Sequence, residues 1–270
     1  MFRRRFWIRV IRSLALIYVG IVVVMMFCEQ SLVYVPTRYP GGNWQMPSLA
    51  FEDAEFTAPD GTRLHGWFVP HDHPRVVILL AHGNGGNLTH RSDILREFHQ
   101  LGAAVMIFDY RGYGKSEGSP SETGILSDAR AARAWLAKRA VISEKQIVLV
   151  GESLGTGVAV DLAAADGARG LVLLSAFTSL PDAAASHYPW LPVRLLMRNR
   201  LDSLSKIADY HGPLLAVHGD ADSIVPYALG RQLFEAANEP KQFVTIRHAD
   251  HNDPPSAEFY RAVDAFLQNL

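Results

Sequence analysis

A G-x-S-x-G pattern at residues 151–155 constrains this chain more than any other feature. The apolar residues 147–150 come directly before it and predict a buried strand, and the small residues 156–165 after it predict a helix. The two glycines allow the sharp turn that exposes a serine hydroxyl between a strand and a helix. The pattern therefore indicates that Ser153 is a nucleophile; the alternative is a glycine-rich connection without chemistry.

A serine hydroxyl reacts efficiently only when a base takes its proton and an acid orients that base. After a strand-turn-helix nucleophile, the acid comes next in the chain and the histidine last. A strand predicted at 214–217 ends just before Asp220 and Asp222, and the last predicted strand ends before His248 and His251. Because α/β sheets bind ligands beyond their strand ends, both pairs lie where a site is expected.

Five sequence blocks carry a family resemblance. They are H-G-N-G-G-N at 82–87, F-D-Y-R-G-Y-G-K-S at 108–116, G-E-S-L-G at 151–155, H-G-D-A-D-S-I-V-P at 218–226 and H-N-D at 251–253. In this order they resemble the α/β-hydrolases, and more narrowly the Bem46-like and ABHD-type membrane-anchored serine hydrolases, which have a serine aminopeptidase-type domain. The similarity runs from about residue 31 to the C-terminus.

The resemblance selects one residue from each pair. It points to Asp222 as the orienting acid and to His251 as the base, in place of Asp220 and His248. It also implies an oxyanion hole made of backbone N–H groups, one from Leu154 after the nucleophile and one from Asn84 in the glycine-rich loop. Neither a cofactor nor a metal is expected in this chemistry.

The expected reaction is a two-step acyl transfer to water, with a carboxylic ester or thioester as the small-molecule or acylated substrate. A peptide or amide is the alternative substrate, because serine aminopeptidases share the same set of residues. A hydrolase-like protein that binds without catalysis is a further hypothesis. In that case the serine would not react with a fluorophosphonate probe.

Apolar strands alternate with helices along the chain, which predicts an α/β fold with a mostly parallel central sheet flanked by helices. Residues 51–57 and 64–69 predict a hairpin at an antiparallel edge. The length of 270 residues and the 49% hydrophobic content suit one large core. We expect one hydrolase domain at residues 31–270, after an N-terminal anchor at residues 1–30.

Between the strands predicted at 170–174 and 214–217, a small cap insertion is expected at about residues 176–211. It is rich in apolar side chains, four of which we expect to bind substrate: Tyr188, Trp190, Leu195 and Leu196. They would line an acyl pocket. The alternatives are that this segment packs on the sheet edge to support the fold, or that it faces a membrane.

The N-terminus predicts a transmembrane helix. Residues 11–28 are almost entirely apolar, and 18 helical residues at about 1.5 Å each span roughly 27 Å, close to a bilayer core. A cleaved signal peptide is the alternative, but no small residues stand where a cleavage site needs them. We therefore expect an uncleaved signal anchor that contacts membrane lipid.

Charge predicts the orientation of that anchor and excludes one class of partner. Five of the 26 basic residues lie in the first twelve positions, which contain no acid. Arginines of this kind stay in the cytoplasm, so the catalytic domain is expected on the opposite side, facing the periplasm if the membrane is a bacterial inner membrane. The rest of the chain has more acids than bases, which does not suit nucleic-acid binding.

Overall fold

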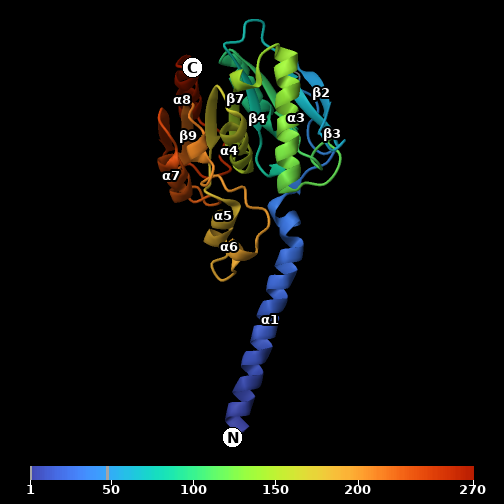
Figure 1. Cartoon of the computed structure of the whole chain (residues 1–270), viewed down its shortest axis with the longest axis vertical. Helices are drawn as coiled ribbons and strands as arrows, with labels where there is room; N and C mark the ends of the chain where they lie inside the picture. Colours follow the sequence, from blue (N-terminus) through green and yellow to red (C-terminus); the bar gives the residue numbers. More distant parts are fainter. Residues whose placement is uncertain (1, 47–48) are drawn as a thin grey trace.

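The computed structural model describes residues 2–46 and 49–270. In this part of the chain, one eight-stranded sheet has the strand order β10-β9-β8-β7-β4-β6-β3-β2 (Figure 1). Its strands are β2 (Glu52–Thr57), β3 (Arg63–Val69), β4 (Val76–Ala81), β6 (Ala103–Phe108), β7 (Ile147–Glu152), β8 (Gly170–Leu174), β9 (Leu214–Gly219) and β10 (Lys241–Ile246).

The sheet is parallel from β10 to β6, and β3 and β2 extend it as an antiparallel hairpin at one edge. The prediction of a mostly parallel sheet with an antiparallel edge is confirmed. Every residue of β4 and β6 is buried, as expected for strands that are covered on both faces. The carboxyl ends of the parallel strands therefore meet at one rim of the sheet.

Helices cover both faces of the sheet. The described helices are α1 (Phe2–Val33), α2 (Ser92–Gln100), α3 (Glu122–Ala140), α4 (Leu154–Asp166), α5 (Leu180–His187), α6 (Val193–Leu196), α7 (Tyr227–Ala236) and α8 (Ala257–Gln268). Those that contact the sheet are α2, α3, α4, α7 and α8. On one face, Val158 of α4 packs in a core with Leu79, and on the other Phe98 of α2 packs with Ile78 and with Val263 of α8. Neighbouring residues of β4 thus point to opposite cores, as the pleat requires.

Short elements complete the described chain. The two-residue strands β1 (Val35–Pro36) and β5 (Gly85–Gly86) pair with each other in a separate small sheet. The 3-10 turns are η1 (Leu88–Arg91), η2 (Glu144–Gln146) and η3 (Ile207–Asp209). Element η1 leads directly into α2, and the Asn87 side chain, which accepts a hydrogen bond from the Thr89 amide, starts this tight turn.

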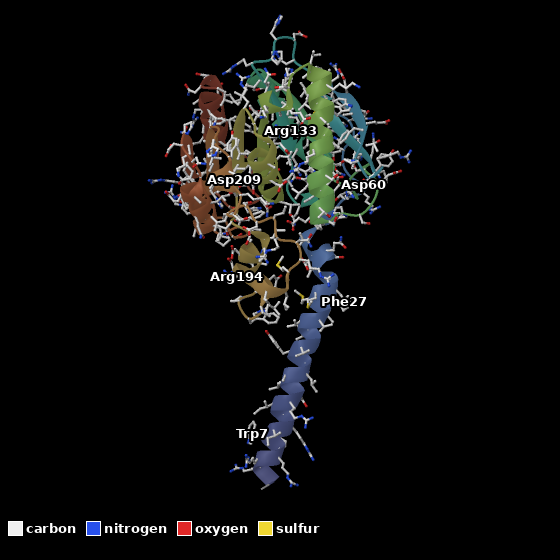
Figure 2. All side chains as sticks on the ribbon, in the orientation of Figure 1. Trp7, Phe27, Asp60, Arg133, Arg194 and Asp209 are labelled. Atoms are coloured by element: carbon white, nitrogen blue, oxygen red, sulfur yellow. The ribbon has the colours of Figure 1, made fainter. Side chains whose placement is uncertain are left out.

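Helix α1 stands clear of the sheet (Figure 1), and side chains such as Trp7 and Phe27 project from it (Figure 2). It is long and apolar enough to cross a membrane, and its most apolar stretch is unburied. The expected boundary near residue 30 lies inside this helix, which continues to Val33.

The inserted segment at residues 175–213, between β8 and β9, contains α5 and α6. We call this whole segment the cap. It lies beside the C-terminal half of α1 (Figure 1). The Tyr18 hydroxyl donates a hydrogen bond to the Trp190 carbonyl oxygen at 2.9 Å, and the Arg198 and Asn199 amides donate to the Glu29 carboxylate. The cap therefore touches both the sheet domain and the apolar helix.

Gly155→Ala tests the packing at the start of α4. A Cβ at this position would lie 1.9 Å from the Ala81 carbonyl oxygen, and the backbone there cannot move without disturbing β4. We expect a loss of at least about 1–3 kcal/mol of unfolding free energy, measured by denaturation in detergent. Gly20→Ala is the control, because its new Cβ meets nothing within 4 Å. Equal stability of the two variants would contradict this packing.

Candidate active site

The turn between β7 and α4 holds Ser153 in a backbone conformation that is unusual for a residue with a side chain. Its φ is 50° and its ψ is −115°, and its amide donates to the Leu174 carbonyl oxygen at 2.9 Å. At Gly151, a Cβ would lie 2.5 Å from the Gly155 carbonyl oxygen, so the turn also needs that glycine. The two glycines let α4 leave the sheet sharply enough to expose Ser153 at the strand end.

His251 lies between the serine and a carboxylate. Its Nε2 is 3.0 Å from Ser153 Oγ, and its Nδ1 is 2.8 Å from Asp222 Oδ2. With the ring proton on Nδ1, the imidazole donates to the carboxylate and accepts from the serine hydroxyl. The loops after β7, β9 and β10 bring these three side chains together at the carboxyl rim of the sheet.

Asp222 is held by a full set of donors. The Ile224 and Val225 amides donate to Oδ1 at 3.0 and 2.7 Å, and His218 Nε2 lies 3.2 Å from Oδ2. Burial alone would raise the pKa of Asp222, but the hydrogen bonds from His218, His251 and Val225 outweigh it, and the pKa falls well below its usual range. The carboxylate therefore remains charged across the neutral pH range.

Asp220 and His248, the alternative acid and histidine in the sequence, contact each other rather than Ser153. The His248 amide donates to Asp220 Oδ1 at 2.6 Å, and His248 has a positive φ of 60°. This hydrogen bond closes the turn after β10 and does not involve the Ser153 hydroxyl. Among the described residues, no group of three or more His, Cys, Asp and Glu side chains could hold a metal ion.

The glycine-rich loop after β4 carries Asn84 beside the turn at Ser153. The Asn84 carbonyl oxygen accepts from the Val35 amide at 3.3 Å and from the Tyr113 hydroxyl at 2.9 Å. Among the residues that the structure describes, none accepts a hydrogen bond from the Asn84 amide. Leu154 is the first residue of α4, where amides have no partner inside the helix. Both amides are thus available to a ligand.

The end of α1 holds this loop in place. Asn84 Nδ2 donates to the Val33 carbonyl oxygen at 3.1 Å. Strand β5, which follows Asn84 directly, pairs with β1. The Thr37 amide donates to the Gly86 carbonyl oxygen at 2.8 Å. The apolar helix therefore continues into a strand that lies against the loop of the candidate site.

An ion pair that sequence reasoning missed lies next to the serine. Arg91 donates two hydrogen bonds to the Glu152 carboxylate, at 2.8 and 2.9 Å, and one to the Gly85 carbonyl oxygen at 3.0 Å. Burial alone would raise the pKa of Glu152, but the Arg91 charge outweighs it and lowers that pKa. The acid in the G-x-S-x-G pattern was the one available signal, because a partly buried carboxylate requires a cation.

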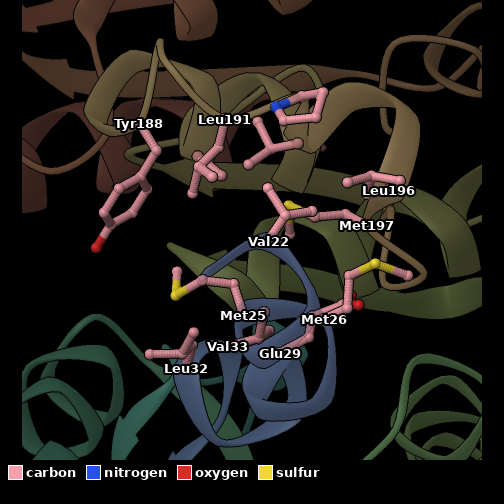
Figure 3. A pocket seen from close by; sticks show the side chains of 13 residues that line it. Val22, Met25, Met26, Glu29, Leu32, Val33, Tyr188, Leu191, Leu196 and Met197 are labelled. Carbon is pink, nitrogen blue, oxygen red and sulfur yellow. The ribbon is translucent and has the colours of Figure 1, made fainter. Parts of the chain in front are cut away.

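An apolar cavity lies between α1 and the cap (Figure 3). Of the four side chains predicted to bind substrate, Tyr188 and Leu196 line it. Trp190 and Leu195 do not, and they are 53% and 82% exposed. The structure thus places two of the four predicted residues in this cavity and two outside it. The α1 side of the cavity was not foreseen from the sequence.

Comparison with known proteins agrees with this architecture. The family model described as "Serine aminopeptidase, S33" matches residues 72–205. An uncharacterized protein of Mycobacterium tuberculosis is 39% identical over 97% of this chain and 94% of its own length. The α/β hydrolase domain-containing protein WAV2 of Arabidopsis thaliana is 32% identical over 88% of this chain and 85% of its own.

A solved esterase of Pyrococcus furiosus superposes with a TM-score of 0.74, at 21% identity, over 88% of this chain and 97% of that one. The sheet and the turn at its rim thus define an α/β fold of hydrolase type. The chain belongs to the α/β-hydrolase family, as its sequence motifs had indicated. Family membership supports an enzyme with hydrolytic function.

Arg91→Met tests the ion pair beside Ser153. The variant leaves the Glu152 carboxylate partly buried without a cation, and we expect about 3 kcal/mol less unfolding free energy, at the low end for a buried pair that loses one partner. Arg91→Met with Glu152→Leu should recover most of that loss. Arg63→Met is the control, because its partner Glu117 is exposed and solvent screens such a pair, so a much smaller loss is expected. If chemical denaturation showed equal losses of unfolding free energy for Arg91→Met and Arg63→Met, the Arg91–Glu152 pair would not be the stabilising contact inferred here.

Proposed function

We propose that this protein is a serine hydrolase that cleaves carboxylic esters or thioesters through an acyl-enzyme intermediate. The position of His251, within hydrogen-bond distance of both Ser153 Oγ and Asp222 Oδ2, carries the proposal. The nucleophile, the base and the orienting acid of such a reaction are thereby assigned to these three residues.

In the first step Ser153 Oγ attacks the carbonyl carbon while His251 Nε2 takes the hydroxyl proton. Asp222 keeps the other ring proton on Nδ1 and stabilises the imidazolium. The oxygen that becomes negative accepts hydrogen bonds from the Leu154 and Asn84 amides. When the intermediate collapses, the bond to the leaving group breaks and His251 returns the proton to the departing alcohol or thiol.

In the second step water replaces the leaving group. His251 takes a proton from the water as its oxygen attacks the acyl carbon, and the same two amides hold the new oxyanion. Collapse breaks the acyl bond to Ser153 Oγ, and His251 returns the proton to that oxygen. The products are a carboxylic acid and the free enzyme, with no cofactor consumed.

Two observations favour an ester with an acyl chain. The cavity between α1 and the cap is lined mainly by apolar side chains, and a zebrafish relative, 36% identical over 63% of this chain and 48% of its own, is named a lysophosphatidylserine lipase. Amide cleavage is the second candidate, because the matching family model is described as a serine aminopeptidase. An aminopeptidase must bind a substrate ammonium, but Glu152 beside Ser153 is already paired with Arg91.

We further propose that α1 is an uncleaved single-pass anchor, with the arginine-rich end in the cytoplasm and the hydrolase domain on the other side. The length and composition of α1 support this placement. The hydrogen bond from the Tyr18 hydroxyl to the Trp190 carbonyl oxygen also supports it, because cleavage after Tyr18 would remove this contact with the cap. Residues 31–270 would then form the catalytic unit, with α1 contributing to it.

Substitution of the three central residues tests the chemistry. Ser153→Ala, His251→Ala and Asp222→Asn should each reduce kcat on p-nitrophenyl esters roughly 10⁴- to 10⁶-fold, and non-additively because the residues act as a unit. His248→Ala and Asp220→Ala are the controls in the neighbouring turn and should cost far less. An essential His248 with a dispensable His251 would refute the assignment of the base.

A fluorophosphonate probe separates catalysis from binding alone. The wild-type protein should be labelled and Ser153→Ala should not, because only an activated serine reacts. An unlabelled wild-type protein would favour the non-catalytic reading. Parallel assays with aminoacyl amides and with esters of graded chain length decide between the two substrate classes.

A reporter enzyme fused after Leu270 tests the placement in the membrane. It should be active only on the side opposite the arginine-rich end, and the protein should stay in the membrane fraction after carbonate washing. A soluble product with a shortened N-terminus would instead indicate a cleaved signal peptide.

A further inference from the structure

We propose that α1 also forms one wall of the substrate site, and that the cavity between α1 and the cap binds the hydrocarbon chain of a membrane lipid ester. The inference rests on the proposed function and deepens it. It assigns substrate selection to a helix that otherwise would only attach the enzyme to the bilayer.

The cavity has two walls from distant parts of the chain (Figure 3). Val22, Met25 and Met26 form the α1 side, and Leu191 and Leu196 are among the residues that face them from the cap. Most of the lining is aliphatic or thioether. Unbranched methionine side chains adapt to irregular partners, which suits chains that differ in length or in unsaturation.

One carboxylate lies in this lining, and it is already satisfied. Glu29 is 8% exposed and accepts hydrogen bonds from the Arg198 amide and from the Asn199 amide and side chain, at 2.7–2.9 Å. The Tyr34 hydroxyl donates to Asn199 Oδ1 at 2.8 Å. These contacts fasten the cap to α1 and supply the carboxylate with hydrogen-bond donors, while the rest of the lining is mainly apolar, so the cavity suits hydrocarbon rather than a polar headgroup.

The location of the cavity selects a lipid chain over a protein partner. The cavity lies along a helix whose most apolar stretch is unburied and long enough to cross a bilayer. Tyr18, Trp190 and Leu195 are exposed around it, and tyrosine and tryptophan are typical of the membrane interface. In that location acyl chains are the abundant apolar ligand, and they need no soluble carrier to reach the cavity.

One residue that lines the cavity contacts the glycine-rich loop of the candidate active site. Val33 lines the cavity, and its carbonyl oxygen accepts the hydrogen bond from the Asn84 side chain. Asn84 is the residue whose backbone amide is assigned to the oxyanion. A lipid chain that enters along α1 would therefore present its ester carbonyl beside the loop that stabilises the negative charge.

Photocrosslinking measures binding without turnover. Full-length Ser153→Ala protein in phosphatidylcholine vesicles is illuminated with a phosphatidylcholine that carries a diazirine at the end of one acyl chain. We expect crosslinks in peptides from both walls, α1 near Val22 and the cap near Leu196. Val22→Trp should remove the cap crosslinks, and Val24→Trp should retain them, because Val24 is exposed and lies outside the cavity. Crosslinks on α1 alone would overturn the proposal.

Turnover gives a second, independent measurement with Ser153 intact. For Val22→Trp, the ratio of dodecanoyl to acetyl ester turnover should fall on the order of tenfold, the effect of excluding about two methylenes. Val24→Trp should keep the wild-type ratio. Equal ratios in the two variants, together with no cap crosslinks in the protein that carries only Ser153→Ala, would refute the acyl site and leave the proposed hydrolysis intact. Cap crosslinks without ester turnover would retain the acyl site and refute the proposed reaction.

Discussion

The close approach of α4 to the end of β4 is the contact on which the rest of this structure depends. Gly155 lies so near the Ala81 carbonyl that no side chain fits between them. This approach allows the strand-to-helix turn to hold Ser153 at a positive φ above the sheet rim. It also places the first amide of α4 and the loop after β4 close to the serine. A wider turn would separate the hydroxyl from both groups.

Charges around the serine are held by fixed partners. Asp222 receives backbone and imidazole donors, and Glu152 receives the Arg91 guanidinium. Both carboxylates would be costly to bury alone. Asp222 is stabilised by amides of its own loop and by His251 from the loop after β10, and Glu152 is stabilised by Arg91, which is distant in sequence. Arg91 also binds the Gly85 carbonyl, so the same ion pair links the serine turn to the glycine-rich loop. The electrostatic arrangement and the backbone geometry thus support each other.

The apolar helix is continuous with the catalytic architecture. After Val33 the chain passes into β1, which pairs with the glycine-rich loop, while Glu29 holds the cap through backbone amides. A carboxylate that is buried against an apolar helix generally has a specific hydrogen-bond partner. Here the partner is the connection after α6. Helix α1, the cap and the glycine-rich loop therefore form one contiguous structure at the rim of the sheet where the candidate site lies.

The sequence by itself determined the parallel sheet, its antiparallel edge and the position of the serine turn, because apolar runs and paired glycines are local signals. Family motifs also selected Asp222 and His251, which the structure brings within hydrogen-bond distance of each other. Only the tertiary structure decided that Arg91 joins Glu152 and that Tyr188 and Leu196 share a cavity with α1, whereas Trp190 and Leu195 do not. Such contacts depend on how separate elements pack and on which way each side chain points, and no local pattern in the chain encodes that.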